Sequence, residues 1–311
     1  MTPLVSILIP CYNARPWLAP TLESALAQTW PAREIIVVDD GSRDGSAEVA
    51  RTFADRGVKV IAQENRGASA TRNCAYRLSQ GEFIQYLDAD DLLATDKIER
   101  QMALAEKTGP EVVLCGTWSR FTQTPADADF TPQPLCTDAA PIDWMVAKFE
   151  QNAMMHPAAW LTPRALAERA GPWDESLTLD DDGEYFTRVV LAARAVRCCR
   201  EAVSYYRSGV SGSLSGIKSE RAWANAYRLM ELSEQWLRAA EDSPRTRHAC
   251  ATAYQRYIYD SYPLAAAYRA RAAAKVAALG GSDLRPPGGP KYRWARRVLG
   301  WRLAKRLQQW R

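Results

Sequence analysis

The sequence has few histidines and no paired cysteine motif. Among its 311 residues are two histidines and seven cysteines, and the cysteines are scattered without a Cys-X-X-Cys pair. Zinc-binding modules and disulfide-stapled scaffolds depend on regular spacings of these residues. We therefore expect neither class, and unpaired thiols of this kind fit a reducing cytosol.

Long apolar stretches and glycine-rich nucleotide loops are also missing. No run approaches the roughly 18 consecutive apolar residues that cross a bilayer, and a strand-like run begins at Leu4 without a basic and apolar leader. We therefore expect neither a secreted nor a membrane-spanning protein. The expected location is the cytoplasm, with the inner face of the cell membrane as an alternative. No Gly-X-Gly-X-X-Gly follows the first strand, which argues against a dinucleotide-dependent oxidoreductase, and the turn 65–67 lacks the glycine spacing of a P-loop.

The excess of basic over acidic residues is confined to one segment of the chain. The net charge is +4, from 40 basic and 36 acidic residues. Residues 285–311 carry no acidic side chain but nine basic ones, which are Arg285, Lys291, Arg293, Arg296, Arg297, Arg302, Lys305, Arg306 and Arg311. Trp294 and Trp301 lie among them, a mixture that favours the interface of an anionic membrane. Packing against the body and disorder are the alternatives, and nucleic-acid binding is not expected because no reader module accompanies the charge.

Strand-like and helical patterns alternate over the first third of the chain. The expected strands are residues 5–9, 35–38, 58–62, 83–87 and 112–115. Between them, apolar residues at helical spacing predict helices over 17–27, 46–56, 68–78 and 97–107. This alternation predicts an α/β fold with a mainly parallel sheet flanked by helices. Such sheets bind ligands at the carboxyl ends of their strands.

The remaining chain is less regular. The expected features are a loop over 117–141, a helix from Pro163 to Gly171, an acidic cluster over 180–184, a strand or hairpin over 196–206, helices over 220–240 and 244–279, and a linker over 280–290. We expect four regions: 1–116 for nucleotide-sugar binding, 117–210 for the acceptor, a helical C-terminal extension over 211–281, and a linker with a basic tail over 282–311.

Polar residues follow three of the expected strands. They form the runs Pro10-Cys11-Tyr12-Asn13, Asp39-Asp40-Gly41-Ser42 and Asp88-Ala89-Asp90-Asp91. Carboxylates this close repel one another unless a cation or hydrogen-bond donors compensate. Asp88 and Asp90, with one small residue between them, can both address a hard cation such as Mg or Mn. The alternative is that the third run is a solvated turn that caps the helix beginning at Lys97, and that Asp39 is a turn residue.

The order and spacing of these runs resemble the family 2 glycosyltransferases of GT-A fold, a Rossmann-type architecture. The resemblance covers roughly residues 4–206 and is carried by 5–13, 35–42, 65–73 and 88–91, followed by 171–177 and 181–188. It implies that Pro10 and Tyr12 line the base pocket and that Asp39 accepts a hydrogen bond from the base. It also implies that Arg72 lies at the nucleotide, that Asp88 holds the ribose and that Asp90, with Asp88, holds the metal.

The same resemblance implies an inverting, Mn- or Mg-dependent transfer from a nucleotide-diphosphate sugar, with UDP as the expected nucleotide. The acceptor would be a saccharide or a lipid-linked molecule of bacterial cell-surface polysaccharide synthesis. Asp182 is the expected catalytic base, and Asp181 is the alternative because it stands where the family usually has Glu. A binding module without turnover and a nucleotidyltransferase are the rival functions, although the latter usually needs a basic, glycine-rich loop that 10–15 lacks.

Some aromatic residues and one histidine have weaker claims to function. His156 precedes a proline and has no neighbouring histidine, so a structural role is favoured over contact with the acceptor or a phosphate. Trp118, Trp160 and Trp173 could shape an acceptor pocket, but core packing is the simpler expectation.

Overall fold

The computed structural model describes residues 2–131, 133–177, 181–209 and 219–309. The chain divides into two compact units, residues 1–215 and 216–311, called here the N-terminal unit and the C-terminal unit. The finer boundaries expected after residues 116 and 281 remain predictions.

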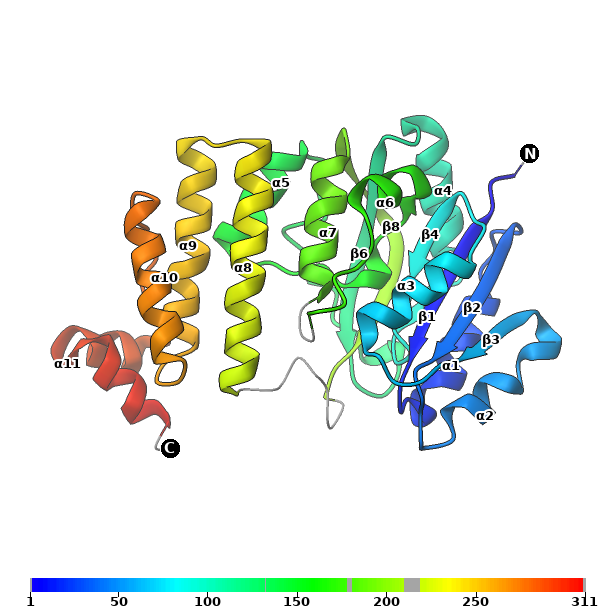
Figure 1. Cartoon of the computed structure of the whole chain (residues 1–311), viewed down its shortest axis with the longest axis horizontal. Coiled ribbons are helices and arrows are strands. Elements are labelled where there is room, and N and C mark those ends of the chain that lie inside the picture. Colours follow the sequence, from blue (N-terminus) through cyan, green and yellow to red (C-terminus); the bar gives the residue numbers. More distant parts are fainter. Residues whose placement is uncertain (1, 132, 178–180, 210–218, 310–311) are drawn as a thin grey trace. The chain divides into compact units, whose positions relative to one another are not determined.

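The N-terminal unit contains two β-sheets with flanking helices (Figure 1). Its strands are β1 (Val5–Cys11), β2 (Arg33–Asp39), β3 (Val58–Ala62), β4 (Phe83–Tyr86), β5 (Leu92–Leu93), β6 (Val112–Phe121), β7 (Thr162–Pro163) and β8 (Ala195–Arg207). Its helices are α1 (Arg15–Leu26), α2 (Ser46–Arg51), α3 (Ala68–Leu78), α4 (Lys97–Thr108), α5 (Pro141–Gln151), α6 (Arg164–Ala170) and α7 (Asp181–Ala192).

The larger sheet is mainly parallel. Its strand order is β3-β2-β1-β4-β7, in which the first four strands run parallel and β7 runs antiparallel to β4. The smaller sheet has the order β5-β8-β6, with β6 and β8 parallel and β5 antiparallel to β8. The predicted mainly parallel α/β fold is confirmed, and the carboxyl ends of β2, β1 and β4 fall at one edge.

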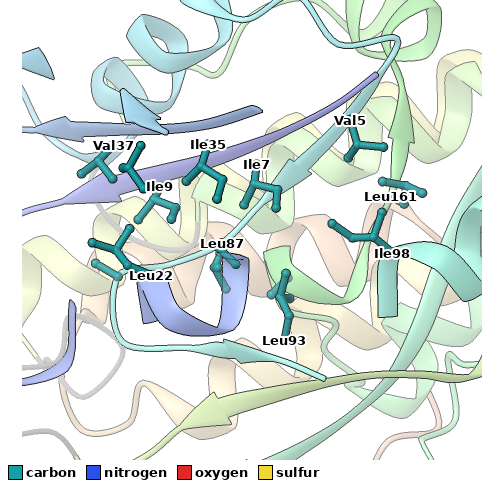
Figure 2. Close-up of a cluster of buried hydrophobic side chains, with 14 of the residues drawn as sticks. Val5, Ile7, Ile9, Leu22, Ile35, Val37, Leu87, Leu93, Ile98 and Leu161 are labelled. Carbon is teal, nitrogen blue, oxygen red and sulfur yellow. The ribbon is translucent and has the colours of Figure 1, made fainter. Parts of the chain in front are cut away.

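Alternate residues of β1 belong to the buried hydrophobic core of this unit (Figure 2). Val5, Ile7 and Ile9 are fully buried in one cluster with residues of β2, α1 and α4. Because successive strand residues point to opposite faces, the buried Leu8 lies on the other face, where α3 contacts β1 and β2. Burial of one such side chain contributes roughly 1.5–3 kcal/mol. The strand β1 is therefore covered by helices on both faces of the sheet.

Two local predictions in this unit need correction, and a third is settled between its two alternatives. The helix expected over 46–56 is only α2, followed by a separate 3-10 turn at Ala54–Arg56. The loop expected from 117 is strand as far as Phe121, because β6 continues to pair with β8. The segment 196–206, expected as a strand or a hairpin, lies in the single strand β8, which pairs in parallel with β6, so the strand alternative is confirmed.

Cys136 and Cys198 form a disulfide, contrary to the expectation from the cysteine pattern. Cys198 on β8 is in register with Cys115 on β6, and Cys136 comes from the connection between β6 and α5. The bonded residues are 62 positions apart, so no local motif marks them. The cross-link ties this connection to β8.

The C-terminal unit is helical, with α8 (Glu220–Ala240), α9 (Pro244–Asp260), α10 (Ala266–Ala278) and α11 (Pro290–Gln309). The single helix expected over 244–279 is wrong, because the chain turns around Pro263, which has no N–H to donate within a helix. Tyr227 of α8 contacts the rings of Tyr254 and Tyr268, so aromatic packing joins α8, α9 and α10. No helix in the described ranges is both long and apolar enough to cross a membrane.

Candidate functional site

Three polar strand ends meet at one edge of the larger sheet, as the parallel pattern predicts. Cys11 at the end of β1 is in register with Asp39 at the end of β2, and β4 runs parallel to β1 on its other side. The N–H of Asp40 donates to the carbonyl of Cys11 at 2.8 Å. The hydroxyl of Thr21 on α1 donates to the carbonyl of Asp91 at 2.9 Å, which holds the segment after β4 at the same edge.

Asp39 offers a buried acceptor near an exposed ring. Its Oδ2 accepts the N–H of Ser42 at 3.1 Å, whereas its buried Oδ1 has no hydrogen-bond partner among the described residues. Leaving such an atom unpaired costs roughly 1–3 kcal/mol, and a ligand N–H would remove that penalty. Tyr12, one residue beyond the β1 partner of Asp39, is 53% exposed, and Pro10 is half-buried. An aromatic face and a carboxylate are groups that can stack on and read a nucleobase.

Asp40 organises the loop before α3, a role that the sequence motifs did not reveal. Its buried carboxylate accepts the N–H groups of Arg66 (2.9 Å) and Gly67 (2.8 Å) and the side-chain amide of Gln63 (2.7 Å). Gly67 has a φ of 91°, in the left-handed region that favours glycine. The start of α3 is thereby fixed to the end of β2, and this sets the position of Arg72.

Arg72 connects two acidic motifs that are far apart in the sequence. Its guanidinium donates to Asp88 at 2.8 Å and to Asp181 at 2.7 Å, and it lies 4.5 Å from the ring centre of Trp173. Burial alone would lower the pKa of Arg72, but the carboxylates of Asp181 and Asp88 outweigh burial and raise the pKa. Arg72 therefore keeps its charge and holds Asp88 and Asp181 at the same guanidinium.

Asp90 and Asp91 lie in a crowded acidic environment after β4. Burial, followed by the neighbouring carboxylates of Asp91 and Asp88, raises the pKa of Asp90 to about 8. The pKa of Asp91 is also raised, mainly by burial, and its oxygens are held by the N–H of Arg207 (2.8 Å) and by Nδ1 of His156 (3.0 Å). The idea that this run caps the helix at Lys97 is wrong, because the residue that precedes α4 is Asp96 and Lys97 is buried.

His156 is an internal residue of this network. It is 1% exposed, and its Nε2 lies 2.9 Å from the hydroxyl of Ser204. Burial lowers the pKa of His156 to about 3, so its ring is neutral at physiological pH. The favoured structural role fits this position, although the ring also orients Asp91. Trp118, Trp160 and Trp173 are all buried, in keeping with core packing.

The acidic run lies at the N-terminus of α7. Asp181 accepts hydrogen bonds at its Oδ2 from Ser69 (2.7 Å) and Arg72, and at its Oδ1 from the N–H of Asp182 (3.1 Å). Asp182 is half-buried, whereas Glu184 is buried and paired with Arg188 at 2.6 Å. The first member of the expected cluster, residue 180, lies outside the described residues. The run is therefore built into the site through Ser69 and Arg72 and is not a fully solvated helix end.

The carboxylates after β4 suit a hard divalent cation. Asp88 and Asp90 supply only oxygen donors, and a cation would relieve the repulsion that raises the pKa of Asp90. They do not form a closed ligand set, because no three His, Asp or Glu ligand atoms of the described residues lie within 4.8 Å of one another. An open set fits Mg or Mn, which keep positions for water and substrate phosphate.

The part of the chain that contains this site is similar in sequence to known proteins. Residues 6–151 match the family model described as Glycosyl transferase family 2. The uncharacterized glycosyltransferase EpsJ of Bacillus subtilis is 29% identical over 212 residues, which cover 67% of this chain and 62% of EpsJ. The chain therefore spans less than two thirds of this curated relative.

Solved structures share the fold at low sequence identity. TarS 1-349 of S. aureus in complex with UDP-GlcNAc matches with a TM-score of 0.63 and 17% identity, over 88% of this chain and 90% of that chain. The mannosyltransferase PcManGT from Pyrobaculum calidifontis, in complex with GDP-Man and Mn2+, matches with a TM-score of 0.57 and 20% identity, over 100% and 83% respectively. These likenesses confirm the expected GT-A-like α/β fold.

Proposed function

Because the chain belongs to glycosyltransferase family 2, we propose that it transfers a sugar from a nucleotide-diphosphate donor to an acceptor hydroxyl, with inversion at the anomeric carbon. The observation that carries the proposal is the bridge made by Arg72, which joins Asp88 at the donor edge to Asp181 at the start of α7. One network thus contains the groups needed at the leaving diphosphate and at the incoming hydroxyl.

The donor would lie along the edge from β2 to β4. The unpaired Oδ1 of Asp39 would accept a ring N–H of the base, and Tyr12 with Pro10 would cover its face. UDP is the proposed nucleotide, in line with the complex recorded for TarS. Asp88 would bind the ribose and Arg72 would hold it in place from the buried side.

A divalent cation, Mn or Mg, would be held by Asp90 with Asp88, and when bound it would neutralise charge on the departing diphosphate. The Mn2+ recorded with PcManGT supports this choice for the fold. Asp90 must lose its proton to act as a ligand, because burial and its acidic neighbours raise its pKa to about 8.

Asp182 is the proposed catalytic base. Both oxygens of Asp181 already accept hydrogen bonds, which leaves Asp181 a positioning residue in this proposal. The Asp182 carboxylate would take the proton of the acceptor hydroxyl as its oxygen bonds to the anomeric carbon. The bond from that carbon to the diphosphate breaks, and the diphosphate leaves with the electron pair. A single displacement of this kind inverts the anomeric configuration.

The acceptor would be a saccharide or a lipid-linked molecule of bacterial surface polysaccharide synthesis.

The basic helix α11 would hold the enzyme at an anionic membrane. Trp294 and Val298 are 69% and 63% exposed on this helix, among cationic side chains. Trp301 instead contacts Tyr259 and Tyr262, so only part of the apolar surface remains available for lipid. Each basic residue near an anionic surface contributes about 1 kcal/mol.

Screening a panel of nucleotide sugars with Mn tests the proposal. One donor should raise the unfolding temperature only with metal present, because ligands that bind the native state stabilise it. The same donor should release its nucleoside diphosphate slowly to water and faster with an acceptor. Metal-dependent binding without any release would indicate a binding module, whereas pyrophosphate formation from a nucleoside triphosphate and a sugar phosphate would indicate a nucleotidyltransferase.

A further inference from the structure

A cavity of about 470 Å³ opens beside the end of β6. Its walls come from the end of β6, from the connection that the disulfide ties to β8, and from residues 151–154 after α5. The rings of Trp118 and Tyr206 lie 5.3 and 5.5 Å from the ring of His156, which contacts Asp91. The cavity wall is therefore linked through Trp118 and His156 to Asp91, the chain neighbour of the proposed metal ligand Asp90.

Arg120 is the cation of this cavity. Its guanidinium lies over the rings of Tyr206 (4.9 Å) and Trp118 (5.7 Å), and one N–H donates to the sulfur of Met154 at 3.3 Å. No carboxylate in the described part of the chain lies within 4 Å of its nitrogens. Because a guanidinium has five donors and thioether sulfur is a weak acceptor, most donors of this exposed side chain have no partner among the described residues.

The remaining lining suits a sugar. Asp129 and Gln133 from the connection and Asn152 from the end of α5 offer groups that can bond hydroxyls. A planar guanidinium held against aromatic rings is the group best matched to a two-oxygen anion, because it can donate two parallel hydrogen bonds to it. The cavity thus combines sites for hydroxyls with one fixed site for an oxyanion.

We propose that this cavity binds the acceptor, and that Arg120 pairs with an anionic oxygen group carried by the acceptor sugar. The proposal rests on the glycosyltransferase function given above and adds the acceptor's chemical class. Phosphate and carboxylate share the required chemistry, so a sugar phosphate and a uronic acid are the two sources to be distinguished.

The test measures binding of glucose 6-phosphate, glucuronate and glucose by calorimetry, with and without UDP and Mn. The wild-type protein should bind one or both anionic sugars, more weakly as salt rises, and bind glucose much less. Arg120→Gln, which keeps the length and some hydrogen bonding, should weaken binding of the anionic sugar roughly ten- to a hundredfold. Arg51→Gln, on the exposed surface of α2, is the matched control and should leave binding unchanged.

Equal binding of glucose and the anionic sugars, absence of any binding, or unchanged binding in Arg120→Gln would overturn the proposal. Release of UDP from the donor to water is measured in parallel, because it needs no acceptor. Arg120→Gln should retain this release, and its loss would place Arg120 on the donor side and refute the acceptor role. Failure of the wild-type protein to bind or cleave any donor would instead refute the proposed function, while anionic-sugar binding measured without UDP still reports on the cavity.

Discussion

Metal binding at Asp90 should be strongly pH-dependent. With a pKa of about 8 in the metal-free protein, only about one Asp90 side chain in ten is ionised at pH 7. A divalent cation must displace the remaining protons, so its apparent affinity should rise about tenfold per pH unit from pH 6 to 7.5 and level off above pH 8. Between pH 6 and 8.5 the total gain approaches two orders of magnitude.

Calorimetric titration of Mn into the protein with a UDP-sugar measures this effect. The diphosphate of a UDP-sugar does not titrate in this range, and repeating the titration in buffers of different ionisation enthalpy counts the protons released. We expect close to one proton per Mn at pH 7. Asp90→Asn should abolish metal-dependent donor binding with the fold intact, whereas Asp96→Asn, a partly exposed carboxylate before α4, should not. A pH-independent Mn affinity in the wild-type protein, or unchanged Mn-dependent affinity in Asp90→Asn, would refute the assignment.

The raised pKa of Asp90 also affects the stability of the fold. The resulting change of stability with pH is opposite in sign to that caused by a salt-bridged acid. The carboxyl of Asp90 ionises near pH 4 in the unfolded chain but only near pH 8 in the metal-free folded protein. The unfolded state therefore binds fewer protons, and Asp90 destabilises the fold progressively as pH rises from about 4 to about 8. Asp90→Asn should accordingly raise the unfolding temperature of the metal-free protein at pH 8 and change it little at pH 4.

Three further predictions concern the base contact, the catalytic base and the tail. Asp39→Ala should weaken donor binding roughly tenfold by removing one base contact, and unchanged affinity would return Asp39 to a turn role. Asp182→Asn should preserve donor and metal affinity but lower turnover on the order of a hundredfold or more. A larger loss of turnover in Asp181→Asn would place the base one residue earlier. No loss of turnover in either variant would mean that the acidic run is structural. Deleting residues 285–311 should reduce sedimentation with anionic vesicles, and the intact protein's binding should fall with salt; equal sedimentation of both forms would exclude the membrane role.

The strands and the edge of the larger sheet could be predicted because their signals are local. A run such as 35–38 is apolar on both faces, as a strand covered by helices on both sides requires, and parallel pairing then places Asp39 beside the end of β1. Helix α8 agrees with the predicted range 220–240, and its Ser219 cap is likewise contained in the local sequence. The break at Pro263 could have been predicted too, because proline disfavours a helix interior in any context.

Other features depend on contacts that no local pattern contains. Asp40 is one of four residues in the run after the second strand, and only the approach of residues 63–67 shows that its carboxylate holds the loop before α3. Cys136 and Cys198 meet because β8 returns beside β6. Likewise, the cavity around Arg120 has walls from three segments, of which the sequence suggested only Trp118.

The choice between two adjacent acids shows what tertiary structure adds to a motif. Asp181 and Asp182 are chemically identical, and the resemblance to a family pair fixes neither as the base. Ser69 and Arg72, 112 and 109 residues away from Asp181, direct their donors to it, and the N–H of Asp182 occupies its second oxygen. A carboxylate used in this way has fewer free lone pairs for an acceptor hydroxyl, and it keeps Arg72 aligned with Asp88. In the proposed mechanism Asp182 takes the proton, because it directly follows Asp181 in the first turn of α7.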